Sequence, residues 1–185
     1  MRAFVAIPLP DEVAEGLERL QRDISVGRIV PRENLHVTLA FLGDLEPGVA
    51  EELHDALCEI EAEPVELCLR GVDVFGRDAP YLVHAGVAPT AGLKALRAKV
   101  HAVAREVGVA LSRKRFRPHV TLARFPRRMP QHELDRLGSF LEAHGAFRLD
   151  PVEVSDFGLY RSHLSNEGPR YEELARYQLG PLAAD

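Results

Sequence analysis

One short stretch of this sequence occurs twice. The residues from His36 to Ala40 read HVTLA, and the same five letters recur from His119 to Ala123, 83 residues further along the chain. Each copy lies in a predicted strand that follows a predicted helix and a loop, which indicates an ancient duplication. Two copies of one unit usually pack about a pseudo-two-fold axis. The repeat therefore predicts two related halves whose equivalent strands face each other across a shared cleft.

Side-chain alternation separates the polar from the apolar positions of each copy. In a strand, His36 and Thr38 point to one side of the sheet, while the intervening valine and the following leucine point to the other. The second copy follows the same pattern, with His119 and Thr121 on its polar side. The apolar positions suit a core. We therefore expect two imidazoles and two hydroxyls to converge on one ligand.

Apolar periodicity along the rest of the chain predicts an α+β fold. Strands are predicted over residues 2–7, 35–42, 65–75, 81–87, 120–125, 147–160 and 171–179. Helices are predicted for the stretches from Pro10 to Ile24, Pro47 to Ile60, Thr90 (as the N-cap) to Gly108, and Pro130 to Leu141. These elements lack the regular βαβ rhythm of a doubly wound sheet, and no linker interrupts them. We expect one domain over residues 1–185.

The composition excludes several classes of protein. Apolar residues make up 46% and charged residues 28% of the chain, as in ordinary globular proteins. No apolar run approaches the ~20 residues that span a bilayer, and the first residues do not read as a signal peptide. The two cysteines, Cys58 and Cys68, are too few for a disulfide framework and are predicted to be reduced, buried thiols. These features predict a cytoplasmic protein.

Positive charge is concentrated around the second repeat. The segment from Arg113 to Arg128 holds seven Arg and Lys residues and no Asp or Glu, although the whole chain carries a net charge of −5. A basic island on an acidic protein favours a local anion site over the wrapping of long duplex nucleic acid. The alternative is a solvated surface run.

Paired histidines with paired threonines suit chemistry at phosphorus. Near the unperturbed pKa of ~6.5, one imidazole can act as a neutral base and the other as a protonated acid. The base takes a proton from water, and the acid protonates the leaving oxygen. The two hydroxyls can donate to the non-bridging phosphate oxygens. Neither H-x-H nor H-E-x-x-H occurs in the chain, so the sequence predicts no metal site and no cofactor.

The paired H-x-T motifs resemble those of the 2H phosphoesterase superfamily, and within it the bacterial and archaeal RNA 2′,3′-cyclic phosphodiesterases, also called LigT-like proteins or 2′-5′ RNA ligases. The similarity covers nearly the whole chain. It is carried by the segments at residues 2–7, 31–43, 116–124 and 159–171. One departure is Ile29, where many members have a tryptophan.

The resemblance implies a bilobal fold of two intertwined lobes, with two antiparallel sheets facing across a cleft and helices on the outside. It also implies metal-independent hydrolysis of RNA 2′,3′-cyclic phosphate ends to 2′-phosphate ends. His36 is then the expected proton donor and His119 the expected proton acceptor, with Thr38 and Thr121 binding the phosphate.

Four further residues are candidates for RNA or nucleotide binding. The resemblance implies that Phe41 and Arg124, just beyond the two motifs, lie close to the nucleobase. Arg127 and Arg128 are expected either to contact the RNA backbone or to be plain surface residues. Among the other histidines, His54, His101, His132 and His144 are predicted on helix surfaces or near loops. The side to which His84 points is left open, and His163 falls in a tail loop that can border the cleft.

Three functions are compatible with these residues. The first is the cyclic phosphodiesterase. The second is ATP-independent 2′-5′ RNA ligation, which uses the same residues in reverse. The third is a non-catalytic module that binds RNA ends or nucleotides. The expected partners are RNA 3′ ends or small cyclic nucleotides, with no membrane, and we expect a monomer.

Overall fold

The computed structural model describes residues 1–166 and 168–180. The last five residues of the predicted domain, 181–185, and Glu167 in the predicted tail loop lie outside the described residues. Among those described, no helix is long and apolar enough to cross a membrane.

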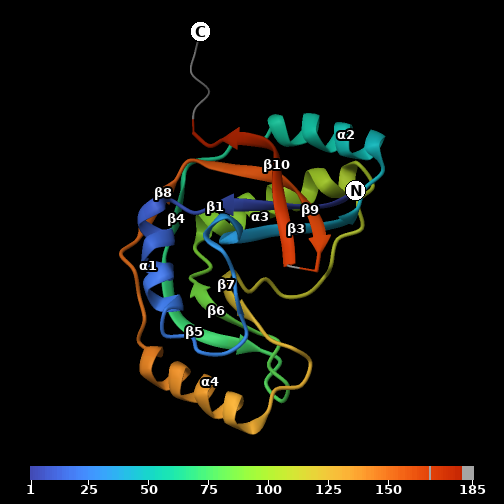
Figure 1. Ribbon diagram of the computed structural model, residues 1–185. Coiled ribbons are helices and arrows are strands. Elements are labelled where there is room, and N and C mark those ends of the chain that lie inside the picture. The colour runs from blue at the N-terminus through green and yellow to red at the C-terminus, as the bar shows by residue number, and fades with distance from the viewer. Residues whose placement is uncertain (167, 181–185) are drawn as a thin grey trace.

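Two four-stranded antiparallel sheets form the framework. The first has the order β10-β9-β1-β3 and the second the order β2-β7-β6-β5. The strands of the first sheet are β1 (Arg2–Pro8), β3 (His36–Asp44), β9 (Asp156–Ser165) and β10 (Gly168–Gln178). Those of the second are β2 (Arg28–Ile29), β5 (Leu69–Phe75), β6 (Leu82–Val87) and β7 (His119–Arg124). The first sheet occupies the upper half of Figure 1 and the second lies below it.

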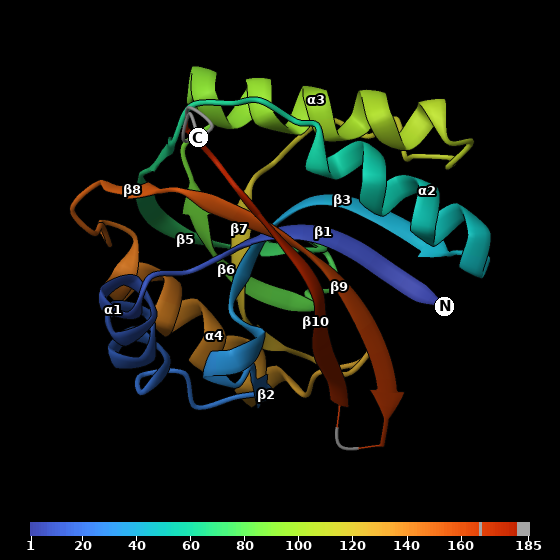
Figure 2. The same cartoon turned by 90° about the horizontal axis from the view of Figure 1, so that it is seen from above.

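The α-helices of the described residues lie on the outside of the two sheets (Figure 2). They are α1 (Asp11–Gln21), α2 (Pro47–Cys58), α3 (Ala91–Glu106) and α4 (Gln131–His144), and a 3₁₀ turn, η1 (Arg32–Asn34), precedes β3. The helix α3 begins at the predicted cap, because the Thr90 hydroxyl accepts a hydrogen bond from the Leu93 amide. It ends just before Gly108, whose φ of +84° is a conformation that favours glycine.

The two halves of the chain exchange helices. The unit β1-α1-β3 corresponds to the unit β6-α3-β7, yet α1 packs against β7 and α3 packs against β3. Each strand that carries an HVTLA motif therefore packs against the helix of the other half. One continuous hydrophobic core joins the apolar faces of both sheets to the helices. The α+β architecture with two antiparallel sheets predicted from the sequence is confirmed.

Some predicted elements were wrong in detail. The predicted strand over residues 65–75 breaks at Cys68 into β4 (Val65–Leu67), which pairs with β8 (Val152–Val154), and β5, which pairs with β6. The stretch over residues 147–160 likewise divides into β8 and β9, and its first residues are not in a strand. Ile24 and Ile60 lie beyond the ends of their helices. The predicted tail loop is the hairpin of β9 and β10.

The prediction of buried cysteine thiols was also wrong. Cys58 lies exposed at the end of α2, and Cys68 is half-buried at the break between two strands. Both thiols are free. The Cys68 thiol donates a hydrogen bond to the Glu66 carboxylate, at 3.3 Å. This side chain therefore contacts a polar surface group and is not part of the hydrophobic core.

Candidate active site

The two H-x-T motifs occupy matching places in β3 and β7, and these two strands contact each other. In both strands the valine and leucine of the motif are buried, while the histidine and threonine are half-buried on the opposite face. The alternation predicted for His36, Thr38, His119 and Thr121 is therefore observed. We call the face of the two sheets that carries these four residues the site face.

Both histidines are held in the same tautomer by the same contact. The Nδ1–H of His36 donates to the carbonyl of Asn34, and that of His119 donates to the carbonyl of Arg117, each at 2.7 Å. Because a carbonyl only accepts hydrogen bonds, Nδ1 carries the hydrogen in both rings. The Nε2 atom of each neutral ring is then the nitrogen that can accept a hydrogen bond or a proton. In His36 it lies 3.1 Å from the hydroxyl of Thr38, which donates to it.

Aromatic rings fix the plane of each imidazole. The ring centroid of His36 lies 4.9 Å from that of Phe4 and 5.3 Å from that of Tyr171. His119 packs edge-on against Phe75, with centroids 4.7 Å apart. Each histidine is therefore positioned by one backbone carbonyl and by neighbouring aromatic side chains, which leaves little freedom of rotation.

Burial lowers the pKa of both imidazoles below the usual 6.5. The pKa of His36 falls to about 4, chiefly through desolvation, and the positive charges of His119 and Arg124 add to the effect. The pKa of His119 also falls through burial, with further contributions from Arg124 and Arg117. The expectation that one ring is protonated at neutral pH in the free protein therefore does not hold. An anion bound between the rings would raise both values.

A bulge in each strand brings the residue beyond the motif onto the site face. Strict alternation would place Phe41 with the buried leucine of its motif. However, Val5 pairs with Ala40 and Ala6 with Thr38, so Leu39 is an extra residue and the alternation shifts by one. Phe41 consequently pairs with Phe4 on the site face, and 68% of its surface is exposed.

The second motif contains the same bulge. Val83 pairs with Ala123 and His84 with Thr121, which leaves Leu122 as the extra residue. The next residue, Arg124, is exposed on the site face, and its charge lowers the pKa of both His36 and His119. The structure thus brings Phe41 and Arg124 to the same face as the four motif residues.

The remaining predicted residues lie further out. Arg127 and Arg128 are exposed on the loop between β7 and α4. Ile29, which stands in place of the family's tryptophan, pairs with Ala123 and is 40% exposed. His163 lies on β9, and its Nε2 is hydrogen-bonded to the Glu172 carboxylate at 2.7 Å. Within residues 1–166 and 168–180, no three His, Cys, Asp or Glu side chains are grouped so that they could hold a metal ion.

A third imidazole was left unassigned by sequence reasoning. His84 pairs with Thr121 on the neighbouring strand and is only 5% exposed. Its ring centroid lies 5.1 Å from that of His119 and 4.5 Å from that of Phe75. Burial lowers the pKa of His84 to about 4, and the charge of His119 lowers it further. The sequence alone does not show that His84 faces the site, because this depends on the register in which β6 pairs with β7.

His101 was wrongly predicted on a helix surface. It is 6% exposed, and its Nε2–H donates to the carbonyl of Leu39 at 3.1 Å. It lies within the apolar stripe of α3, where periodicity alone predicts burial and a polar residue needs a partner. His54 and His132 are exposed on their helices, as predicted, and His54 is hydrogen-bonded to Tyr177. His144, at the end of α4, lies 3.0 Å from the Asp23 carboxylate.

His84 and His101 should respond to leucine substitution in opposite ways. Both ring nitrogens of His84 are buried without a hydrogen-bond partner among the residues that the structure describes, so H84L is expected to raise the free energy of unfolding by about 1 kcal/mol. H101L leaves the buried carbonyl of Leu39 unpaired and is expected to lower that free energy by about 1–2 kcal/mol. Urea unfolding of the two variants tests this. A loss of stability in H84L as large as that in H101L would contradict it.

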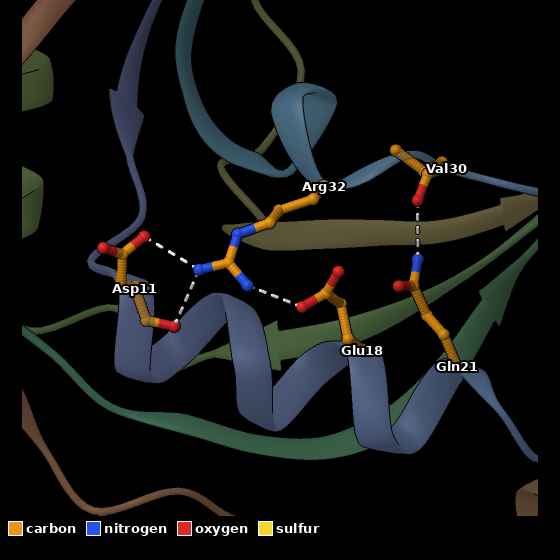
Figure 3. A network of polar contacts seen from close by, with 5 residues as sticks. All are labelled: Asp11, Glu18, Gln21, Val30 and Arg32. Atoms are coloured by element: carbon orange, nitrogen blue, oxygen red, sulfur yellow. Dashed lines mark hydrogen bonds and ion pairs between the residues drawn. The ribbon is translucent and has the colours of Figure 1, made fainter.

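The segment before the first motif is held by α1. The guanidinium of Arg32 in η1 pairs with Asp11 at 2.8 Å and with Glu18 at 2.6 Å (Figure 3). Two residues later, the Asn34 side-chain amide donates to the carbonyl of Pro169 in β10 at 2.8 Å. These contacts fix the carbonyl of Asn34, which accepts the hydrogen bond from His36.

Comparison with known proteins places this geometry in a family. The family described as the 2′-5′ RNA ligase superfamily matches residues 9–166. The chain is 36% identical to an RNA 2′,3′-cyclic phosphodiesterase of Aeropyrum pernix, over 80% of this chain and 83% of that protein. It is 33% identical to a protein of the same name from Geobacillus stearothermophilus, over 95% of this chain, although it spans only 56% of that protein.

Solved structures show the same fold. E. coli LigT complexed with 3′-AMP superposes with a TM-score of 0.75 at 26% identity, covering 97% of this chain and 98% of that one. The crystal structure of a phosphoesterase superposes with a TM-score of 0.78 at 26% identity, with the same coverage. With matching sequence, fold and paired motifs, the chain belongs to the 2′-5′ RNA ligase superfamily.

Proposed function

We propose that this protein is an RNA 2′,3′-cyclic phosphodiesterase that opens the cyclic phosphate at an RNA 3′ end, or on a nucleotide, to a 2′-phosphate. The observation that carries the proposal is the matched pair of imidazoles. His36 and His119 have the same tautomer, with the hydrogen on Nδ1, and each shares its face of the strand with the threonine of its own motif. Relatives named for this activity support it.

The proposed reaction is a single in-line displacement. His119 takes a proton from water as the water oxygen bonds to phosphorus, and the bond from phosphorus to O3′ breaks. His36 protonates the departing O3′, leaving a 3′-hydroxyl and a 2′-phosphate. The hydroxyls of Thr38 and Thr121 donate to the non-bridging oxygens, on which negative charge develops. Protons are thereby moved by the two imidazoles alone.

The nucleoside is proposed to lie against Phe41 and Arg124. An exposed aromatic ring and a guanidinium both stack on any base, so this pair suits RNA ends of different sequence. Arg127 and Arg128 on the next loop are proposed to contact the RNA backbone. The complex of E. coli LigT with 3′-AMP supports nucleotide binding in this fold.

Turnover of a defined RNA tests the function. A short RNA with a 2′,3′-cyclic phosphate end is incubated with the protein in EDTA, and the product end is identified by mass spectrometry and by its response to phosphatase. We expect a 2′-phosphate and a rate close to that without chelator. A cyclic end that is bound but persists indicates a binding module, and joined RNA indicates a ligase. Activity lost in EDTA and restored by a divalent ion would contradict the proposed mechanism.

The pH dependence should be displaced to the acid side. One imidazole must be protonated and the other neutral, so kcat/KM rises through the lower pKa and falls through the higher one. Because burial lowers the pKa of His36 to about 4 and that of His119 below 6.5, the maximum should lie below pH 6.5. In kcat it should lie at higher pH, since the bound phosphate favours protonated imidazoles. Rate measurements from pH 4 to 9 check this. A rise in kcat/KM that continues to pH 9 would be incompatible with the two-histidine mechanism.

A further inference from the structure

The extra residues of the two bulges, Leu39 in β3 and Leu122 in β7, are buried. Their carbonyls accept hydrogen bonds from side chains outside the two strands that form each bulge. Leu39 lies in β3, which is the edge strand of its sheet, so no neighbouring strand offers an amide on that side. Leu122 lies in β7, whose outer neighbour is the two-residue strand β2. A buried carbonyl without a donor is costly. Each bulge therefore depends on a donor from outside its own pair of strands.

One side chain of α3 serves the first bulge. The Nε2–H of His101 donates to the carbonyl of Leu39 at 3.1 Å in a fully buried hydrogen bond. Burial lowers the pKa of His101, which favours the neutral ring, and the Leu39 carbonyl then selects the tautomer whose hydrogen is on Nε2. The residue that follows the bulged pair is Phe41.

One side chain of α1 serves the second bulge. The Nε2 amide of Gln21 donates to the carbonyl of Val30 at 2.8 Å (Figure 3) and to the carbonyl of Leu122 at 2.9 Å. The Leu122 carbonyl also accepts from the Val30 amide, at 2.9 Å, so Gln21 is the second donor to this carbonyl and ties it to Val30, the residue that follows β2. Gln21 is 6% exposed, as is His101. The residue that follows this bulged pair is Arg124.

The two donors occupy equivalent places in the two halves. Gln21 is on the helix after β1 and His101 on the helix after β6, and each reaches the motif strand of the opposite half. Different side chains perform the same contact at the same position of the bulge. A requirement for a hydrogen-bond donor, rather than for a particular residue type, explains this.

We propose that Gln21 and His101 are positioning residues, each of which holds one bulge and so keeps one nucleoside-contacting side chain on the site face. Gln21 acts on Arg124, and His101 acts on Phe41. Loss of either donor lets the bulge relax toward regular alternation, which turns the following side chain toward the core face. The histidines and threonines of the motifs precede the bulges and keep their orientation. The expected effect is therefore on nucleoside affinity and not on the chemical step.

The proposal rests on the proposed function only where it assigns Phe41 and Arg124 to the nucleoside. The positioning role is tested by removing one donor at a time, so that the intact bulge in the other half of the molecule serves as the control. Q21M and H101L remove the donor with little change in volume. Q21H and H101Q each install the donor type that the opposite half uses. Every variant is also made in the R124A and F41A backgrounds.

Two readouts are measured on each variant: kcat and KM for a cyclic-phosphate dinucleotide, and Kd for 3′-AMP by calorimetry. Q21M is expected to raise KM and Kd about tenfold, the effect of one lost charge-assisted contact, with kcat changed less than twofold. In the R124A background Q21M should add nothing further, whereas in the F41A background its effect should persist. H101L should add nothing further in the F41A background, whereas in the R124A background its effect should persist. Q21H and H101Q should keep KM and Kd within about twofold of wild type.

Other outcomes overturn the proposal. Equal effects of Q21M in the R124A and F41A backgrounds, or a fall in kcat that matches the rise in KM, would show that Gln21 only stabilises the fold. If Q21M does not fold, H101L with its H101Q rescue decides the question in the same way. The Kd for 3′-AMP needs no turnover, so the crossed pattern can be found even if the protein does not hydrolyse cyclic phosphates. Failure of the positioning role is thus separable from failure of the proposed function.

Discussion

Alanine substitution of either His36 or His119 is expected to lower kcat/KM by about 10²–10⁴, because each removes one proton transfer from the rate-limiting displacement. The two transfers belong to one step, so the double variant should lose less than the product of the two single losses. H132A is the matched control, since His132 is exposed on α4, and it should retain wild-type kinetics. Steady-state rates on a cyclic-phosphate dinucleotide measure all four proteins.

Multiplicative losses in the double histidine variant would show that the two rings act in separate steps. A loss of less than threefold in either single variant would remove that histidine from the chemistry. Unfolding curves accompany the kinetics, because His36 and His119 also pack against Phe4 and Phe75, and a collapsed site must be distinguished from a missing proton.

Valine at either motif threonine is expected to lower kcat by about 10²-fold, the usual cost of one lost donor to a developing oxyanion. Valine keeps the shape and removes only the hydroxyl. The two variants should differ in their pH dependence, because the Thr38 hydroxyl donates to Nε2 of His36 and favours its neutral form. T38V should therefore raise the pKa of His36 that is seen in the pH profile of kcat/KM, while T121V should leave that pKa unchanged.

T90V is a suitable control for the threonine variants. The Thr90 hydroxyl accepts from the Leu93 amide at the start of α3, so T90V is expected to cost about 1 kcal/mol of stability with kcat unchanged. If kcat falls no more in T38V and T121V than in T90V, the motif hydroxyls do not contact the phosphate.

Much of the site could be predicted from the sequence because strand alternation is local. The repeated HVTLA stretch defines which side chains share a face, and the duplication implies that two such faces meet. The buried valine and leucine positions of β3 and β7, opposite the histidines and threonines, follow from this pattern. The helix α3, which is capped by Thr90 and ends just before Gly108, was predictable for the same reason, since caps are encoded within a few residues.

The features that depend on pairing between distant strands could not be predicted. Alternation alone places Phe41 and Arg124 on the core face, and only the register with β1 and β6 shows the bulges that reverse this. The resemblance to known proteins supplied what the pattern could not. In the same way, the carbonyls that His101 and Gln21 reach, those of Leu39 and Leu122, are defined only by the packing of α3 and α1 against the opposite half.

The pKa values of the histidines also depend on the assembled site. From the sequence, two imidazoles near 6.5 predicted a mixed protonation state at neutral pH. In the structure, desolvation and the mutual repulsion of His36, His119 and Arg124 disfavour any protonated ring in the free protein. The proton needed for the leaving group must therefore become stable when the anionic substrate arrives, which links binding to catalysis.

The division of labour between the two histidines is tested most directly with a substrate whose bridging 3′-oxygen is replaced by sulfur. A thiolate leaves without protonation, so H36A should hydrolyse this cyclic phosphorothiolate at a rate close to that of the wild type, while H119A should remain impaired by about 10²–10⁴. Equal rescue of both variants, or rescue of H119A alone, would contradict the assignment of His36 as the acid and His119 as the base.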